Sequence, residues 1–443
     1  MGLNKPLLVF LLSGTLLVVS CSVTKKTPPP VVEKPTVLAP KVVVKEVVRK
    51  DTFFENLLSQ YPQLFDQVLK NRENWNVQII YTAIDRSDNG IPVLTNHSFN
   101  LNSDRYFYPA STVKLPISLL ALQKLNELKI NGLDKNTTML TDQAYSGQTP
   151  VYNDPNTRDG KPSIAQYIKK ILIVSDNDAY NRLYEFLGQD YINEQLQKKG
   201  YGSTQIFHRL GVSLSADQNR HTNPIKFLSP QGSSLYNQPM QSALRKYPVR
   251  KDSIGKAFYS GGKLVNQPMD FSTKNKIGLA DLHAILVGLV FPNSVNPAQR
   301  FNITAEDRNF MLKHMSQLPS ESVSPPYSAD TATYWPAYSK FLLLGSQKGL
   351  IPKNIRIFNK EGDAYGQLTD VAYIVDFDKK IEFFLSCTIY CNKDGILNDD
   401  IYEYETIGFP FMKHLGQLIY GLETKRSRNN IPDLSSFKFE YNQ

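Results

Sequence analysis

Apolar residues recur at helical spacing through much of the chain, and this pattern predicts several amphipathic helices. The longest begins at Ser111 and is expected to end at Asn131-Gly132, because glycine commonly follows the last turn of a helix. Another begins near Ser163, which can cap it, and a third is stopped by Gly188. The segments with helical spacing are 53–69, 111–131, 163–174, 178–187, 278–289, 305–318 and 404–422.

Strand patterns lie near both ends of the folded region. Segments 76–85 and 91–99 flank Ser87-Asp88-Asn89-Gly90, a strong signal for a hairpin turn. Segments 355–359, 370–377 and 380–390 are rich in Ile, Val, Phe and Tyr, which favour strands. Strands at both ends with helices between them predict one sheet assembled from distant parts of the chain.

The middle of the chain, residues 200–270, is polar and rich in Pro, Gly, Ser and Asn, which indicates loops and a hairpin. Part of it, about 222–272, is expected to be an insertion into the helical region. Its role is left open between reshaping the rim of a cleft and being a surface excursion.

The N-terminus carries a targeting pattern. Lys5 precedes an apolar run that ends at Ser20-Cys21 and is too short to span a bilayer comfortably, so residues 1–20 are predicted to be a signal peptide. The preceding residues make this site resemble a bacterial lipobox, which implies lipidation of Cys21; an ordinary signal peptide with a chance cysteine is the alternative. Ser22 resembles the sorting signal for an outer membrane. We therefore expect a lipid-anchored protein of the cell envelope, at the periplasmic face or cell surface.

The composition of the chain indicates its domain organisation and limits the partners and cofactors that we expect. Residues 21–50 are rich in Pro, Val and Lys and are predicted to be a tether, followed by one domain at 51–425 and a tail at 426–443. The 443 residues are 41% hydrophobic and 21% charged, as in folded soluble proteins, with a formal charge of +9. Lys and Arg are scattered, and the three Cys and six His are dispersed. We expect a monomer with no nucleic-acid partner, no metal and no organic cofactor.

The candidate nucleophile is Ser111, with Lys114 as its base. Residues three apart lie on one face of a helix, and a helix start favours developing negative charge. A lysine amine serves as a base once desolvation or a second cation lowers its pKa. Ser-x-x-Lys occurs five times, at 22, 111, 253, 260 and 435, but only the copy at Ser111 opens a long apolar helix.

Two further motifs follow in order. Ser175-Asp176-Asn177 joins two predicted helices, whereas the other Ser-Asp-Asn, at 87–89, is the hairpin tip. Lys360-Glu361-Gly362 follows a strand and precedes a strand pair; other Lys-x-Gly copies include those at Lys276, in a helix start, and Lys393, in a turn. Each motif alone is weak, but the three in this order and setting favour one catalytic site.

Together with Tyr108-Pro109-Ala110 before Ser111, these motifs resemble the class A β-lactamase and penicillin-binding serine enzyme superfamily. The resemblance implies an α/β (α+β) fold in which an antiparallel sheet of N- and C-terminal strands packs with helices, plus an all-helical subdomain. It implies catalytic roles for Ser111, Lys114 and Ser175. It implies substrate-binding roles for Asn177, Lys360, Gly362 and Asp363, with the backbone N–H groups of Ser111 and Asp363 as the oxyanion hole.

The chain departs from this pattern at two points. No glutamate occurs between Glu194 and Glu306, so the residue that would activate the deacylating water is missing from the expected loop at 208–214. Asp217 is the nearest carboxylate, and a solvated loop charge is the favoured interpretation of it. Glu361 replaces a hydroxyl residue that would bind a substrate carboxylate, and it would repel an anion unless it turns away or pairs with a lysine.

The sequence therefore predicts a serine hydrolase that forms an acyl-enzyme on Ser111 with a β-lactam or a related peptidoglycan peptide. A D-Ala-D-Ala peptidase or penicillin-binding protein with slow deacylation is one alternative. A lipoprotein that binds cell-wall peptide without catalysis is the other.

Overall fold

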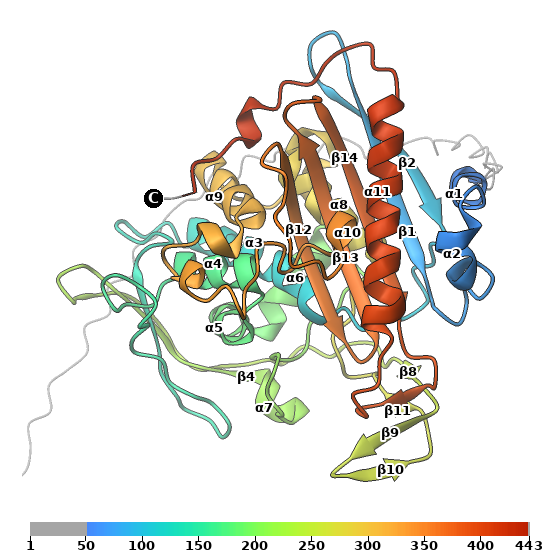
Figure 1. Cartoon of the computed structure of the whole chain (residues 1–443). Helices are drawn as coiled ribbons and strands as arrows, with labels where there is room; N and C mark the ends of the chain where they lie inside the picture. The colour runs from blue at the N-terminus through green and yellow to red at the C-terminus, as the bar shows by residue number, and fades with distance from the viewer. Residues whose placement is uncertain (1–50, 442–443) are drawn as a thin grey trace, which may run out of the picture. The chain divides into compact units, whose positions relative to one another are not determined.

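A five-stranded antiparallel sheet forms the centre of the domain, in the order β12-β13-β14-β1-β2 (Figure 1). The computed structural model describes residues 51–441, so the predicted signal peptide, Cys21 and the tether lie outside the described residues. The strands are β1 (Gln78–Arg86), β2 (Pro92–Phe99), β12 (Ile355–Ala364), β13 (Gln367–Asp376) and β14 (Ile381–Tyr390). The prediction of one sheet from both ends of the domain is confirmed.

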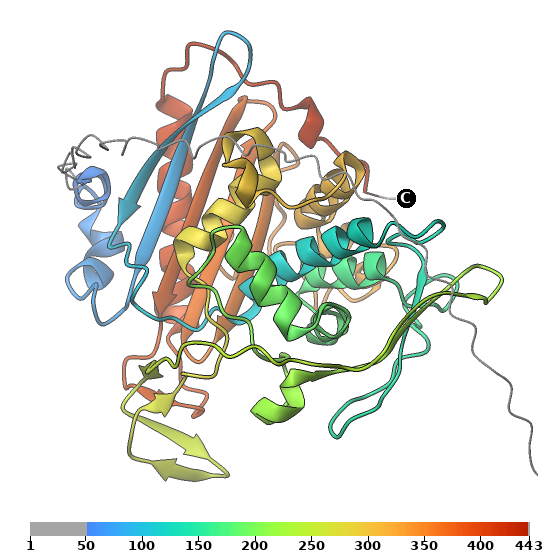
Figure 2. The ribbon, with the colours of Figure 1, turned by 180° about the vertical axis from the view of Figure 1, so that it is seen from behind.

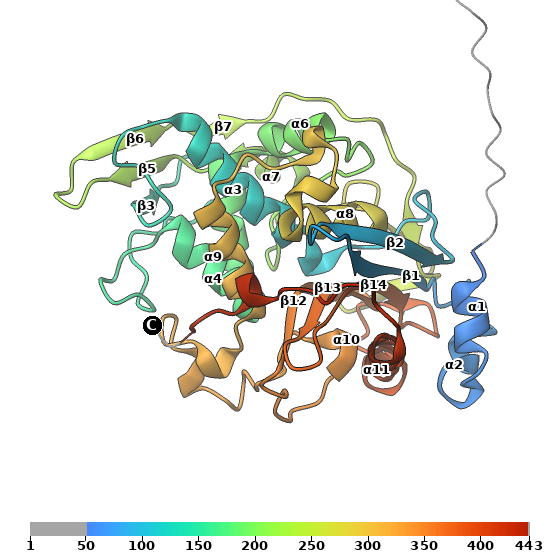
Figure 3. The ribbon, with the colours of Figure 1, turned by 90° about the horizontal axis from the view of Figure 1, so that it is seen from above.

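Helices cover both faces of this sheet (Figure 3). One face carries the C-terminal helix together with α10, α1 and α2, and the other carries α3, α4, α8 and α9. This mixed α/β arrangement confirms the predicted fold class. The helices of four or more residues are α1 (Phe53–Leu58), α2 (Pro62–Leu69), α3 (Lys114–Leu128), α4 (Ile164–Val174), α5 (Asn177–Leu187), α6 (Gln189–Lys198), α7 (Ala216–Arg220), α8 (Leu279–Val290), α9 (Ala305–Ser316), α10 (Phe341–Leu344) and α11 (Phe409–Lys425), with a π-turn at Tyr404–Gly408 before α11.

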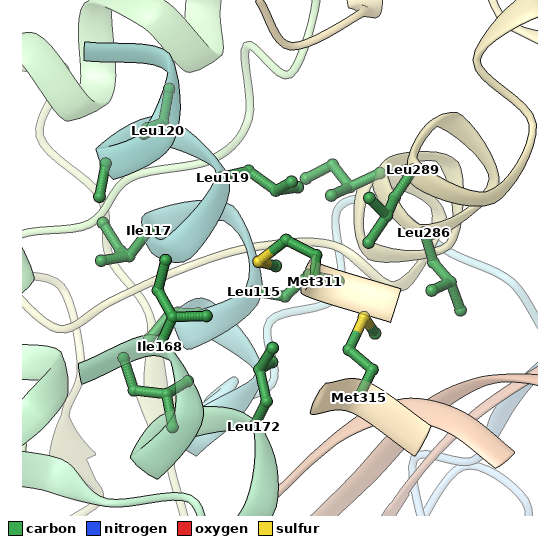
Figure 4. Packing of buried hydrophobic residues seen from close by; sticks show 14 of the residues in the cluster. Leu115, Ile117, Leu119, Leu120, Ile168, Leu172, Leu286, Leu289, Met311 and Met315 are labelled. Carbon is green, nitrogen blue, oxygen red and sulfur yellow. The ribbon is translucent and has the colours of Figure 1, made fainter. Parts of the chain in front are cut away.

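The helix α3 runs through the middle of the helical layer, which lies in front of the sheet in Figure 2 (α3 in teal). Every residue from Lys114 to Leu125 is buried, so this helix is enclosed on all sides rather than along one stripe. Figure 4 shows Leu115 and Leu119 of α3 beside Met311 of α9 and Leu289 of α8. This packing fixes the start of α3, where Ser111 and Lys114 lie.

Several boundaries differ from the prediction. The segment at Ser111 begins as a 3₁₀ turn, η1 (Ala110–Val113), and α3 ends at Leu128, where Lys129 takes a left-handed φ of 51° before Asn131-Gly132 is reached. The helix predicted at 53–69 is two helices, because a short turn interrupts the helical backbone between Leu58 and Pro62. The helix α6 was not predicted, since its sequence is mostly polar and buries few apolar side chains.

The strand β12 is longer than predicted, because it continues from Lys360 to Ala364, a segment with no alternation of apolar and polar residues. Backbone pairing with β13 holds this segment in an extended conformation, which its side-chain pattern did not indicate. In the register of this pairing, Glu361 lies opposite Asp370 and Gly362 lies opposite Thr369. The Lys360-Glu361-Gly362 motif therefore lies within the edge strand of the sheet.

The polar middle of the chain forms small strands rather than loops alone. The strands β8 to β11 project beyond one end of the main sheet, below it in Figure 1, and β9 pairs in parallel with β15 near Ile396. Two further small sheets accompany the helical layer. One of these small sheets consists of β3 (Thr138–Thr141), β5 (Ile225–Leu228) and β6 (Ser234–Gln238), and the other of β4 (His221–Thr222) and β7 (Gln241–Ser242). The projecting strands are β8 (Ser253–Ile254), β9 (Ala257–Ser260), β10 (Lys263–Val265) and β11 (Met269–Asp270), and β15 is Ile396–Leu397.

The segment after α11 packs against the core through the buried side chains of Leu434 and Phe437. Cys387 and Cys391 are both buried and both free. None of the helices within residues 51–441 combines the length and the apolar character needed to cross a membrane.

Candidate active site

Ser111 lies in the turn η1, pressed against the backbone of the edge strand β12. A Cβ atom on Gly362 would lie 2.6 Å from the backbone nitrogen of Ser111 and 2.9 Å from that of Thr112. Glycine is therefore the residue that allows this approach. Ala110, just before the serine, has a left-handed φ of 45°, which is a strained conformation for a residue with a Cβ.

The side chain of Lys114 is fully buried beside Ser111. Its Nζ lies 2.8 Å from Ser111 Oγ, 2.7 Å from Asn177 Oδ1 and 3.2 Å from Ser175 Oγ. Burial, and then the nearby charge of Lys360, hold the pKa of the Lys114 amine well below its usual value. A neutral amine at this distance can accept the proton of the serine hydroxyl.

Ser175 and Asn177 reach the site from the junction of two helices. Ser175 ends α4 with a left-handed φ of 60°, and Asp176 caps α5 by accepting a hydrogen bond from the N–H of Ala179 (2.7 Å). The tight reversal directs the Ser175 hydroxyl and the Asn177 amide toward Lys114. A non-glycine residue held in this conformation costs on the order of 1 kcal/mol, which the surrounding contacts offset.

Lys360 completes the cluster from β12. Its Nζ donates to Ser175 Oγ (2.9 Å) and lies 2.8 Å from Glu361 Oε1. Both side chains are almost fully buried, at 0% and 4% exposure. Of the two possibilities open for Glu361, the carboxylate pairs with a lysine, and that lysine is its own neighbour in the motif.

The register of the β12–β13 hairpin sets the direction of the Asp363 amide. The two turn residues, Tyr365 and Gly366, have positive φ angles of 53° and 77°, so Ala364 and Gln367 form the closing hydrogen-bonded pair. The next pair, Asp363 with Leu368, is then a non-hydrogen-bonded pair. The N–H of Asp363 consequently points out from the free edge of the sheet, on the side where η1 packs.

The loop at 208–214 closes another side of the site and is held by α5. Asn181 exchanges two hydrogen bonds with the backbone of Leu210 (2.8 and 3.0 Å), and Arg209 forms a buried ion pair with Glu185 (2.8 Å). Gly211 then packs directly on Asn177, since a Cβ there would lie 2.9 Å from Asn177 Nδ2. This loop brings no carboxylate to the site. Asp217 is 64% exposed and bonds to Tyr145, in keeping with a solvated loop charge.

A pocket of about 400 Å³ opens in front of Ser111. Much of its wall has no local sequence signal, because the segment 398–402 approaches Ser111 only through tertiary packing. Its lining residues are Tyr108, Ala110, Ser111, Asn177, Leu210, Gly211, Asp363, Ala364, Tyr365, Asn398, Asp400 and Tyr402.

All seven residues predicted for catalysis or substrate binding lie around this pocket or directly behind it. Of the other copies in the described part of the chain, Ser87-Asp88-Asn89 is at a hairpin tip and Lys276 precedes α8, and neither lines the pocket. Within the described part of the chain, no group of three or more His, Cys, Asp or Glu side chains is placed to hold a metal ion. The roles assigned to the seven residues remain predictions.

Residues 65–236 match the model of a family described as the beta-lactamase enzyme family, Beta-lactamase2. This beta-lactamase family match contains Ser111, Lys114, Ser175 and Asn177, and it ends before the strand that carries Lys360. No curated protein sequence matches the chain.

Solved structures similar to the chain include a beta-lactamase from Sphaerobacter thermophilus (13% identity, 85% of this chain and 99% of that chain, TM-score 0.43). A class A beta-lactamase from Clostridium kluyveri has 14% identity over 82% of this chain and 99% of its own, with a TM-score of 0.43. A mutant form of PBP-A, in an acyl-enzyme complex with penicillin G, has 15% identity over 84% of this chain and 97% of its own, with a TM-score of 0.43.

Proposed function

We propose that this protein is a serine acyl-transfer enzyme that forms an acyl-enzyme on Ser111 with β-lactams or related peptidoglycan peptides. The observation that carries the proposal is the pairing of Ser111 Oγ with a fully buried Lys114 amine at 2.8 Å. Burial and the charge of Lys360 lower the pKa of that amine, so a large fraction of it is neutral at a lower pH than for an exposed lysine. The family match over residues 65–236 supports a β-lactamase-like hydrolase.

In the proposed reaction, Ser111 Oγ attacks the carbonyl carbon while its proton passes to Lys114 Nζ. The resulting oxyanion accepts hydrogen bonds from the N–H groups of Ser111, at a helix start where backbone donors lack helical partners, and of Asp363. When the C–N bond breaks, the leaving nitrogen takes the proton of Ser175 Oγ, and Lys114 returns a proton to Ser175 across 3.2 Å. The products from a peptide are a Ser111 ester and a free amine, whereas a ring-opened β-lactam keeps its amine attached to the acyl group.

Release of the acyl group is proposed to be slow. Hydrolysis needs a base beside the ester to activate water, and the loop at 208–214, which packs on Asn177, carries no carboxylate. A persistent adduct is typical of penicillin-binding proteins, so a D-Ala-D-Ala peptidase or penicillin-binding role is the second candidate. A protein that only binds cell-wall peptide has no need for a buried lysine beside a serine hydroxyl, so we do not favour that role.

For its location, we propose a lipid anchor at Cys21 that holds the domain on a membrane of the cell envelope through the tether at 21–50. The lipobox-like sequence before Cys21 supports this. Labelling of cells with radioactive palmitate tests it, with loss of the label expected in Cys21→Ala.

Labelling with a fluorescent penicillin tests the acyl-enzyme. The wild type is expected to carry a covalent label that Ser111→Ala lacks, both proteins having the same melting temperature. Turnover of a chromogenic cephalosporin then separates the two candidates, with a burst of about one equivalent and no sustained hydrolysis expected for a persistent adduct. A folded wild type that is not labelled by any β-lactam, as free acid or as ester, would refute the proposal.

A further inference from the structure

The positive charge of Lys360 is compensated within the protein. Its Nζ lies 2.8 Å from Glu361 Oε1 and also 3.0 Å from the Glu361 carbonyl oxygen. With both side chains at most 4% exposed, little water separates the two charges. Pairing weakens the repulsion that Glu361 alone would exert on an anion. It also neutralises the positive charge with which Lys360 would attract an anion.

The pocket in front of this pair is acidic. Asp363 and Asp400 line it, and its lining residues, all within the described part of the chain, include no Lys or Arg. Tyr108, Tyr365 and Tyr402 supply aromatic rings to the same wall, and such rings attract cations.

Other cations near the site do not reverse this balance. The pKa of Lys114 is lowered by burial, which favours its neutral form. Lys340 lies behind β12, where its Nζ donates to the carbonyl of Met315 and to Asn359 Oδ1, both at 2.6 Å. Asp363 and Asp400 are therefore the charged side chains that line the pocket in front of Ser111.

We propose, on the basis of the function proposed above, that Glu361 and Asp363 are specificity-determining residues that select against acyl donors with a carboxylate next to the scissile bond. The preferred donors have an uncharged or cationic leaving group, such as an amidated or amine-bearing peptide. The order of acylation rates is then cationic, neutral, anionic, from fastest to slowest.

The test compares three forms of one penicillin: the free acid, its methyl ester and its dimethylaminoethyl ester. They share the same acylating ring and differ in the charge beside it. The second-order rate constant for adduct formation on the full chain is measured by intact-mass spectrometry. For the wild type the esters are expected to react faster than the acid. Glu361→Gln leaves Lys360 unpaired and is expected to raise the acid-to-cation rate ratio about tenfold or more, and Asp363→Asn to shift it in the same direction.

The control is Glu194→Gln, which removes one carboxylate from the exposed Lys198–Glu194 pair and is expected to leave the ratio unchanged. Asp363 lies at the exposed edge of the strand, so Asp363→Asn keeps the test decisive should Glu361→Gln fail to fold. A wild type that prefers the acid, or a ratio unmoved in both folded site variants, overturns the inference while the Ser111 adduct upholds the proposed function. No Ser111 adduct with any of the three probes overturns both.

Discussion

The substitution Gly362→Ala probes the contact between β12 and the turn that carries Ser111. The new methyl carbon would lie 2.6 Å from Ser111 N, 2.9 Å from Pro109 O and 2.9 Å from Thr112 N. All three are backbone atoms, so no side chain can rotate away. The strand and the turn must separate by at least 0.4 Å to reach 3.0 Å, a spacing below which real Cβ contacts essentially do not occur.

That separation displaces the N–H groups of Ser111 and Asp363 relative to each other. Loss of one oxyanion donor lowers an enzymatic rate by about 10²–10³, so we expect the rate of Ser111 acylation to fall about 100-fold. Overpacking is expected to lower the free energy of unfolding by roughly 1–3 kcal/mol. Stopped-flow acylation and urea unfolding measure the two effects.

The matched control is Gly421→Ala on α11, where an added Cβ meets no atom within 4 Å. It is expected to leave the acylation rate unchanged and to stabilise the helix slightly. If Gly362→Ala acylates within threefold of the wild type, the assignment of the Asp363 and Ser111 amides to the oxyanion is wrong.

Three further predictions concern the site and its support. The acylation rate is expected to rise with pH as Lys114 loses its proton, with a midpoint well below that of an ordinary lysine because burial lowers its pKa; a midpoint near 10.5 in the pH–rate profile would argue against Lys114 as the base. Arg209→Met leaves the buried carboxylate of Glu185 with Arg182 as its remaining partner and is expected to cost up to about 3–5 kcal/mol of unfolding free energy, whereas Lys198→Met in an exposed pair costs little; equal urea midpoints would contradict this. Leu115→Ala opens a cavity in the core of Figure 4 and is expected to cost about 2–5 kcal/mol in the same assay, and a loss below about 1 kcal/mol would contradict the packing described.

Much of the candidate site could be predicted from sequence, because its residues belong to local sequence patterns. Ser111 stands where a long apolar helix begins, and Ser175 stands where one helix stops and another is capped. Helix periodicity and capping depend on neighbouring residues, so these positions could be predicted from the local sequence without knowledge of the fold. The hairpin between β1 and β2 was predicted for the same reason.

The remaining features depend on segments far apart in the chain. Whether the Glu361 carboxylate turns away or pairs with Lys360 is decided by burial at the sheet edge, which the motif does not encode. Asp400 reaches the pocket from a loop that follows the last strand of the main sheet, far along the chain from Ser111. The extension of β12 through its polar residues depends on pairing with β13, since those residues lack an apolar alternation.

The most direct test of the central claim is peptide mapping of the wild type after incubation with the free acid and the esters of one penicillin. We expect a single acyl modification, on the peptide that contains Ser111, and none in Ser111→Ala. An unmodified Ser111 peptide with all probes, or equal modification of Ser111→Ala, would contradict the assignment of Ser111 as the nucleophile.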